Sequence, residues 1–305
     1  MSSVRANGIQ IEYESFGSES DPVIVLIMGL GMQLIAWPDP FCQKLAAAGF
    51  RVVRFDNRDI GLSTYFDDRG VPNMVWQFIK ARIGLRVRNA YDLNDMAADT
   101  IGLMDALQVR DAHMVGASMG GMIAQQVAAK YPARVRSLVS IMSTSGDRRL
   151  PPATREAQRA LFSRPANPND PNSVVEHSMK IWGVIGSPGF PTPPDELRAR
   201  TQRSVARSYH PQGVARQLVG ILASGDRSSD LATIRKPTLV IHGDSDPLVR
   251  PACGEDTAKK IPGAKLKIIK GMGHDMAAWP VLADEILTHA RAVQNRSFSG
   301  EISHA

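Results

Sequence analysis

The most constraining stretch of this sequence is Gly116–Ala117–Ser118–Met119–Gly120, which fits the pattern G-x-S-x-G. An apolar run precedes it and a segment typical of a helix follows, so the pattern predicts a sharp turn between a buried strand and a helix. In such a turn the backbone of the central serine is strained, and the two glycines let strand and helix approach each other. Unpaired N–H groups of the first helical turn then face the serine hydroxyl. We therefore expect Ser118 to be a nucleophile presented above the edge of a sheet.

Composition and charge are those of an ordinary globular chain. Of 305 residues, 43% are hydrophobic and 22% are charged, which suits one main domain with one insertion. The N-terminus lacks the apolar core of a signal peptide, and the longest apolar run, residues 23–32, is too short to span a bilayer. We therefore expect a cytoplasmic protein without a membrane span.

The charge pattern and the cysteines argue against nucleic-acid binding, a disulfide framework and a cysteine metal site. The net charge of +6 comes from scattered arginines rather than from basic blocks interleaved with aromatic residues, which argues against binding to nucleic acid. Cys42 and Cys253 are too few for a disulfide framework and lie far from any metal-ligand spacing. We expect both cysteines to be reduced packing residues.

Short apolar runs alternate with helical patterns along most of the chain. The run at residues 23–28 is apolar without alternation, which is typical of a strand buried on both faces of a parallel sheet. The repeated order of strand and helix predicts an α/β fold, with a mostly parallel central sheet flanked by helices. Near the N-terminus, two alternating runs are joined by Asn7–Gly8, which suits a type I′ turn. This hairpin is expected to form one edge of the sheet. The expected strands are residues 3–6, 9–15, 23–28, 51–55, 113–117, 135–142, 237–242 and 264–269, and the expected helices include 40–48, 92–107 and 276–293.

The alternation stops between residues 146 and 229. Prolines punctuate helical patches at residues 173–184 and 195–209, and apolar residues recur throughout the segment. A linker has no need of these apolar residues, so the segment is better interpreted as a helical cap. We predict that residues 1–145 and 230–305 form the core and that residues 146–229 form the inserted cap.

Polar residues follow the last two predicted strands. A serine nucleophile needs a base, and the base needs a carboxylate that holds its tautomer. Asp244 and Asp246 follow the strand at residues 237–242, and His274 follows the strand at residues 264–269. The carboxyl ends of parallel strands share one edge of the sheet, where open α/β folds place their sites. These side chains are therefore expected beside Ser118.

The chain order Ser118, Asp246, His274, together with the G-x-S-x-G turn, resembles the α/β-hydrolase superfamily. Within that superfamily the chain is similar to the bacterial group of aclacinomycin methylesterase, on the stretch Met28–Gly29–Leu30–Gly31 and on Trp37–Pro38–Asp39. The resemblance covers nearly the whole chain outside the cap. It implies an inserted-cap α/β-hydrolase fold and a serine esterase that acts on a small-molecule ester and needs no cofactor or metal.

The same resemblance implies roles for individual residues. Ser118 is the expected nucleophile, His274 the general base and then general acid, and Asp246 the carboxylate that orients the histidine. Asp246 fits the family's spacing of the acid after its strand. Asp244 and, more remotely, Asp147 stay open as alternatives for the acid.

Two loops are expected to support the site. The resemblance implies an oxyanion hole made by the backbone N–H groups of Leu30 and Met119. The sequence departs from the family at Met28, where histidine is commoner, and this departure concerns the hydrogen bonds that fix the loop. The stretch Asp56–Asn57–Arg58–Asp59, with Gly61, resembles the family pattern Asp-x-Arg-x-x-Gly-x-Ser. We expect it to brace the loops around the site.

The expected reaction is hydrolysis of a carboxylic ester through an acyl-enzyme. Serine rather than aspartate at position 118 argues against epoxide hydrolase and haloalkane dehalogenase chemistry. Lactonase, perhydrolase and carbon–carbon bond hydrolase activities use the same triad and stay open, as does a non-catalytic ligand-binding protein of this fold.

The predicted cap carries more arginines than acidic residues. A solvated face is the ordinary explanation, and a substrate that bears a carboxylate is the alternative. The arginines in question are Arg148, Arg149, Arg155, Arg159, Arg198, Arg200, Arg203 and Arg207.

Overall fold

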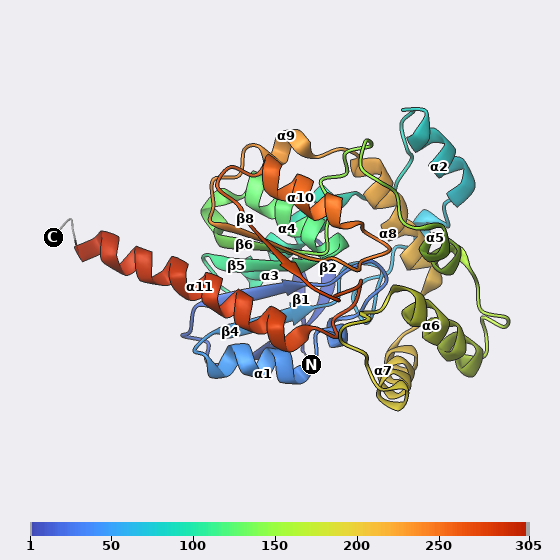
Figure 1. Ribbon diagram of the computed structural model, residues 1–305, viewed down its shortest axis with the longest axis horizontal. Coiled ribbons are helices and arrows are strands. Elements are labelled where there is room, and N and C mark those ends of the chain that lie inside the picture. Colours follow the sequence, from blue (N-terminus) through green and yellow to red (C-terminus); the bar gives the residue numbers. More distant parts are fainter. Residues whose placement is uncertain (1, 303–305) are drawn as a thin grey trace.

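The computed structural model describes residues 2–302, and its centre is a twisted sheet (Figure 1). Within these residues the sheet has eight strands in the order β1-β2-β4-β3-β5-β6-β7-β8. β1 pairs antiparallel with β2, and β2 pairs antiparallel with β4, whereas every other pair is parallel. The predicted α/β fold with a mostly parallel sheet is confirmed. The strands are β1 (Ser2–Ala6), β2 (Ile9–Phe16), β3 (Val23–Ile27), β4 (Arg51–Phe55), β5 (Ala112–Ala117), β6 (Val135–Ile141), β7 (Thr238–Gly243) and β8 (Lys265–Ile269).

The N-terminal hairpin forms one edge of this sheet, as predicted. Asn7 and Gly8 join β1 to β2 with φ angles of 48° and 80°. Both angles lie in the left-handed region that a type I′ turn requires, which asparagine and glycine tolerate best.

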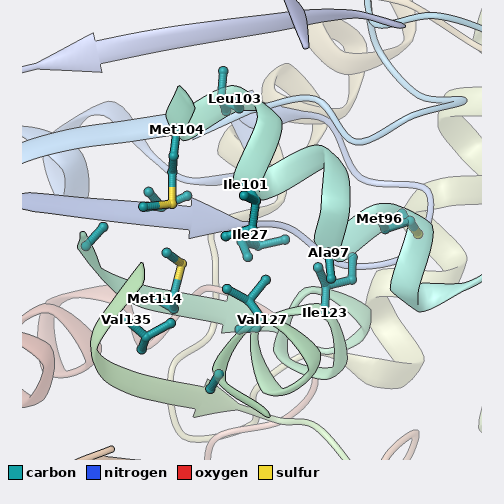
Figure 2. Close-up of a cluster of buried hydrophobic side chains, with 14 of the residues drawn as sticks. Ile27, Met96, Ala97, Ile101, Leu103, Met104, Met114, Ile123, Val127 and Val135 are labelled. Atoms are coloured by element: carbon teal, nitrogen blue, oxygen red, sulfur yellow. The ribbon is translucent and has the colours of Figure 1, made fainter. Parts of the chain in front are cut away.

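Helices cover both faces of the sheet because its central strands are apolar on both sides. α3 (Leu93–Ala106) and α4 (Met119–Lys130) pack on one face, and α1 (Asp39–Ala47) and α11 (Trp279–Ile302) pack on the other. Figure 2 shows the first of these cores, where Ile27 and Met114 of the strands lie against side chains of α3 and α4. Each fully buried aliphatic side chain of this kind contributes about 1.5–3 kcal/mol. The two cores therefore fix β5 and α4 in position, and with them the turn that joins this strand to this helix.

The segment between β6 and β7 contains five α-helices joined by loops and, among the described residues, no strand. It contains α5 (Arg155–Phe162), α6 (Pro171–Ile185), α7 (Pro194–Arg207), α8 (Pro211–Ser224) and α9 (Ser228–Leu231). Three of these helices begin with proline, whose fixed φ and missing N–H suit the first helical turn. Figure 1 shows α5 to α8 grouped at one end of the sheet, away from the C-terminal part of α11. None of the helices in residues 2–302 combines the length and the apolar composition needed to cross a membrane.

Outside the segment predicted to be a helical cap, two of the described α-helices were not predicted from the sequence. α2 (Met74–Arg82) lies in an excursion between β4 and α3, and α10 (Pro251–Lys260) lies between β7 and β8. α2 is apolar on most of its surface, so its sequence lacks the polar stripe that reveals a surface helix. The final helix begins at Trp279 rather than at residue 276.

A buried histidine makes the stability of this core depend on pH. His113 of β5 is 1% exposed, its Nδ1 lies 2.7 Å from Ser137 Oγ, and its Nε2 is buried without a hydrogen-bond partner in the described chain. Burial, with a smaller contribution from the positive charges of Arg136 and His289, lowers the pKa of His113 to about 3. The unfolded chain takes up a proton near pH 6.5, which the folded chain does not, so stability is lost as pH falls below about 6.5.

We therefore expect His113→Gln to reduce the loss of unfolding free energy at acid pH. Between pH 7 and pH 4.5 the free energy of unfolding should fall about 2.5 kcal/mol less in the variant than in the wild type. Urea unfolding at the two pH values measures this difference. Equal losses in both proteins would mean that His113 is protonated in the fold.

Candidate active site

The turn between β5 and α4 has the strained geometry that the sequence predicts. Ser118 adopts φ 56° and ψ −118°, and its N–H donates to Ile141 O of the neighbouring strand at 2.9 Å. A Cβ at Gly116 would lie 2.0 Å from Gly120 O, and a Cβ at Gly120 would lie 2.0 Å from Ile27 O. Only glycine fits at these two positions. The turn thus fixes the Ser118 side chain at the edge of the sheet.

Two loops at the same edge bring a histidine and a carboxylate to this serine. His274 Nε2 lies 3.0 Å from Ser118 Oγ, and His274 Nδ1 lies 2.7 Å from Asp246 Oδ2. Asp246 follows β7 and His274 follows β8, which adjoin each other in the sheet. The three predicted side chains therefore form one continuous chain of hydrogen-bond contacts, all drawn from the carboxyl ends of parallel strands.

Asp246 is buried but well supplied with donors. Its Oδ1 accepts from Leu248 N and Val249 N, each at 2.9 Å. His242 Nε2, which also lies 2.8 Å from Val249 O, is 3.6 Å from Asp246 Oδ2. Burial alone would raise the pKa of Asp246, but the facing His274, its hydrogen bond to the carboxylate and the nearby His242 outweigh burial and hold that pKa well below its usual range. Asp246 is therefore ionised at neutral pH.

The two alternative acids are occupied elsewhere. Asp244 is exposed and accepts from Ser245 Oγ and from Gly271 N. Asp147 forms ion pairs with Arg149 and Lys260, at 2.6 and 2.8 Å. Of the three carboxylates weighed from the sequence, Asp246 alone contacts His274 in the described structure.

The predicted oxyanion donors lie on the two segments next to Ser118. Met119 is the first residue of α4, so its N–H has no partner within the helix. The loop that carries Leu30 passes close to the serine, because a Cβ at Gly29 would lie 3.1 Å from Ser118 Cβ and 3.6 Å from Ser118 Oγ. Both backbone segments therefore border the space above the hydroxyl.

A family model described as the alpha/beta hydrolase fold matches residues 22–280. The chain belongs to the α/β-hydrolase family. This hydrolase is 29% identical to rhodomycin D methylesterase DauP of Streptomyces sp. (strain C5) and 27% identical to rhodomycin D methylesterase DnrP of Streptomyces peucetius, in each case over 92% of this chain and 94% of the relative. The resemblance to bacterial methylesterases expected from the sequence is confirmed.

A solved structure agrees on the fold. The crystal structure of a hydrolase from Pseudomonas aeruginosa PA01 superposes on this hydrolase with a TM-score of 0.68 at 24% identity. The match covers 94% of this chain and 97% of that chain. It therefore includes most of the helical segment between β6 and β7 as well as the sheet.

In this hydrolase the loop that carries Leu30 is fixed by hydrogen bonds from other segments, which answers the question raised by Met28. Asn57 Nδ2 donates to Met28 O at 2.9 Å, and Asp56 Oδ1 accepts from Leu34 N at 2.7 Å. Gln217 Oε1 of α8 accepts from Gly31 N at 2.9 Å. The predicted bracing role of the stretch from Asp56 to Asp59 is confirmed, and Gln217 is a further brace that the sequence pattern did not indicate.

Ion pairs with two buried carboxylates join helices α7 and α8 to this bracing loop. Arg207 of α7 pairs with Asp56 at 2.7 Å, and Arg216 of α8 holds both carboxylate oxygens of Asp59, at 2.7 and 2.8 Å. The Arg207 side chain is 10% exposed. The expectation of a solvated face is therefore wrong for Arg207, because this side chain points into the core. Arg198, by contrast, forms an exposed pair with Glu176.

The same ion-pair cluster contains a group of potential metal ligands. Asp59, Asp67 and His210 offer ligand atoms within 4.8 Å of one another. The guanidinium of Arg216 already contacts all three residues, at 2.7, 2.7 and 3.0 Å. A cation is thus supplied by the chain itself, and the cluster is better explained as a link between α8 and the core.

Removing Arg216 should destabilise the hydrolase far more than removing a surface arginine. Arg216→Met leaves the buried Asp59 without its counter-ion, which typically costs about 3–5 kcal/mol. Arg198→Met, in α7, breaks an exposed pair and should cost about 1 kcal/mol or less. Chemical unfolding of both variants measures the contrast. Similar losses in the two would show that Arg216 does not carry the junction of α8 and the core.

A second contact joins α6 to the loop of the catalytic histidine candidate. His274 N donates to the carbonyl oxygen of Ile185, the last residue of α6, at 2.7 Å. The next residue, Asp275, accepts from Ser187 Oγ at 2.5 Å and from Ser187 N at 3.1 Å. Sequence reasoning missed Asp275 and Ser187, since neither belongs to a motif. Together they hold the backbone of His274 at the C-terminal end of α6.

Proposed function

We propose that this chain is a serine hydrolase that cleaves carboxylic esters through an acyl-enzyme. The observation that carries the proposal is the contact chain from Ser118 Oγ to His274 Nε2, 3.0 Å, and from His274 Nδ1 to Asp246 Oδ2, 2.7 Å. These distances are within the hydrogen-bonding range that general-base activation of a serine requires.

In the first half of the reaction the ester is split. Ser118 Oγ forms a bond to the ester carbonyl carbon while its proton passes to His274 Nε2. The tetrahedral intermediate then loses the alcohol as the carbon–oxygen bond breaks, and the alcohol oxygen takes the proton from His274. The acyl group stays on Ser118 as an ester.

In the second half water releases the acid. A water molecule gives its proton to His274 Nε2 as its oxygen attacks the acyl carbon. The bond to Ser118 Oγ breaks, and the serine recovers the proton from His274. Ionised Asp246 keeps the Nδ1 proton in place and stabilises the imidazolium in both halves.

The backbone N–H groups of Leu30 and Met119 are the proposed oxyanion donors. Both lie on segments that border the Ser118 hydroxyl, and α4 directs its N-terminus to the same space. One such donor typically contributes about 2.7–4 kcal/mol to the stabilisation of the transition state. The loop must stay rigid for this purpose, and the contacts of Asn57 and Gln217 provide that rigidity.

We propose that residues of the core carry out the reaction and that residues of the cap select the substrate. Residues 1–145 and 230–305 supply the triad, and residues 146–229 lie over it through α6, whose end contacts the His274 loop. The sequence identity of 29% and 27% to two rhodomycin D methylesterases supports a methyl ester of a larger acid as the substrate class.

Hydrolysis of two ester series tests this function. p-Nitrophenyl esters of increasing acyl length measure turnover at Ser118, and methyl esters of bulky acids measure the proposed preference. Turnover of both series, with kcat/KM favouring the bulky methyl esters, is expected. Turnover of lactones alone would favour the lactonase alternative. Binding of an ester without turnover would favour a ligand-binding protein.

A further inference from the structure

The outer face of α2 carries an apolar surface that no part of the described chain covers. We call it the α2 apolar face and define it as Val75, Trp76, Ile79 and Ile83, the last following the helix directly. Their exposed fractions are 71%, 53%, 43% and 62%. The spacing of one, four and eight residues from Val75 places them on one side of a helix. Contiguous exposed apolar surface of this kind marks a site of interaction.

The opposite side of α2 is firmly attached, so the exposure is not the result of a loose helix. Gln77 is buried and its Oε1 accepts from Arg88 N at 3.2 Å. Phe78 packs edge-on against Phe162 of α5, with ring centroids 5.4 Å apart. Asn73 caps the helix by accepting from Trp76 N at 3.1 Å. The helix is therefore held in place with one apolar side inward and another apolar side outward.

The chain around this face is strongly basic. Residues 69–90 contain no aspartate or glutamate, and their five basic residues are Arg69, Lys80, Arg82, Arg86 and Arg88. This segment alone has a charge of +5, against +6 for the whole chain. Arg86 and Arg88 are exposed, and within residues 2–302 no ion pair involves Lys80, Arg86 or Arg88.

A basic hollow lies beside the helix. It has a volume of about 740 Å³ and is bounded by Arg69, Lys80, Arg86, Arg88 and Arg216, with no acidic side chain in its lining. Arg216 is already paired with Asp59 and Asp67. Arg69 pairs with the exposed Asp68 at 3.1 Å. Lys80, Arg86 and Arg88, which form no ion pair within residues 2–302, are therefore the cations that can meet an anionic lipid headgroup.

We propose that the α2 apolar face and the basic hollow together bind the surface of an anionic lipid bilayer. Aromatic and aliphatic side chains next to Lys and Arg are the composition of helices that lie in the membrane interface. The apolar side chains enter the boundary between headgroups and acyl chains, and the basic side chains meet lipid phosphates, each adding roughly fivefold to the affinity.

Charge favours a bilayer over a second copy of the chain. A symmetric dimer through this face would bring two segments of +5 against each other, since a two-fold contact pairs a surface with itself. An anionic bilayer instead neutralises them. Because α2 packs on α5 of the cap (Figure 1), attachment would place the cap side of the molecule at the lipid surface.

Vesicle co-sedimentation of the full chain tests the proposal. Vesicles with one third phosphatidylglycerol in phosphatidylcholine should bind the protein at least tenfold more tightly than phosphatidylcholine alone, and binding should weaken steeply from 50 to 300 mM salt. Lys80→Gln/Arg86→Gln/Arg88→Gln should bind about 100-fold more weakly. Ile79→Ser/Ile83→Ser should lose at least tenfold. Brominated lipid should quench the fluorescence of the wild type but not that of Trp76→Phe.

Matched controls separate this face from general effects. Arg5→Gln/Arg110→Gln/Arg235→Gln removes the same charge from exposed positions elsewhere, and Leu266→Ser/Ile268→Ser removes exposed apolar side chains of β8. Both controls should bind as the wild type does. All variants should hydrolyse a dissolved ester normally, so this inference and the proposed function fail separately. Absent binding to anionic vesicles, equal binding to neutral ones, or α2 variants that dissolve a dimer without changing vesicle binding would overturn the proposal.

Discussion

Replacement of Ser118 by alanine is expected to lower kcat for ester hydrolysis by about 10⁶-fold, the scale reached when the serine of a triad is removed. The reason is geometric, because within the described chain Ser118 Oγ is the hydroxyl that contacts His274 Nε2, at 3.0 Å. The measurement is steady-state hydrolysis of a p-nitrophenyl ester by extensively purified protein. The turnover that remains in the variant should come only from the oxyanion donors and from substrate binding.

Ser245→Ala provides the control for this experiment. Ser245 lies one residue from Asp246 and donates to Asp244 Oδ1 rather than to the triad candidates. Its replacement should leave kcat within a few-fold of the wild type. Unchanged thermal unfolding of Ser118→Ala would show that the loss is chemical. An alanine variant that retained a tenth of the activity would refute the nucleophile assignment.

The second large effect is expected at the carboxylate. Asp246→Asn should lower kcat by about 10⁴-fold, because an amide favours the wrong tautomer of His274 and does not stabilise its charged form. KM should change little, since Asp246 is buried beneath His274 and is 1% exposed. Measurement of kcat and KM separately distinguishes this from a defect in binding.

Asp244→Asn is the matched comparison in the same loop. Its carboxylate accepts from Gly271 N and Ser245 Oγ on the exposed side of the loop. The variant should keep kcat within about tenfold of the wild type. A larger loss at Asp244 than at Asp246 would contradict the assignment of the acid, and so would a comparable loss in Asp147→Asn.

Much of this arrangement is predictable from the sequence because local rules determine it. The glycines at 116 and 120 are required by contacts with backbone oxygens, so a strained turn around Ser118 has a recognisable pattern. Parallel strands place Asp246 and His274 at one edge, which order and spacing along the chain already indicate. Asn7–Gly8 fixes the edge hairpin for the same local reason.

The features that escaped sequence reasoning depend on contacts between distant segments. Arg216 meets Asp59 from 157 residues away, and Ser187 meets Asp275 from 88 residues away. No periodicity or motif encodes such a pairing. α2 escaped for a different reason, because apolar residues on both of its sides remove the amphipathic signal by which a surface helix is recognised. The outward apolar side of α2 is the surface that we propose enters the lipid interface.

The most direct test of the central claim is to titrate the enzyme with a serine-directed phosphonate and to locate the adduct by mass spectrometry. The account predicts one equivalent of label on the peptide that contains Ser118, with activity lost in proportion to labelling, and no label on Ser118→Ala. Full turnover by labelled protein, or an inactivating label on another residue, would contradict it.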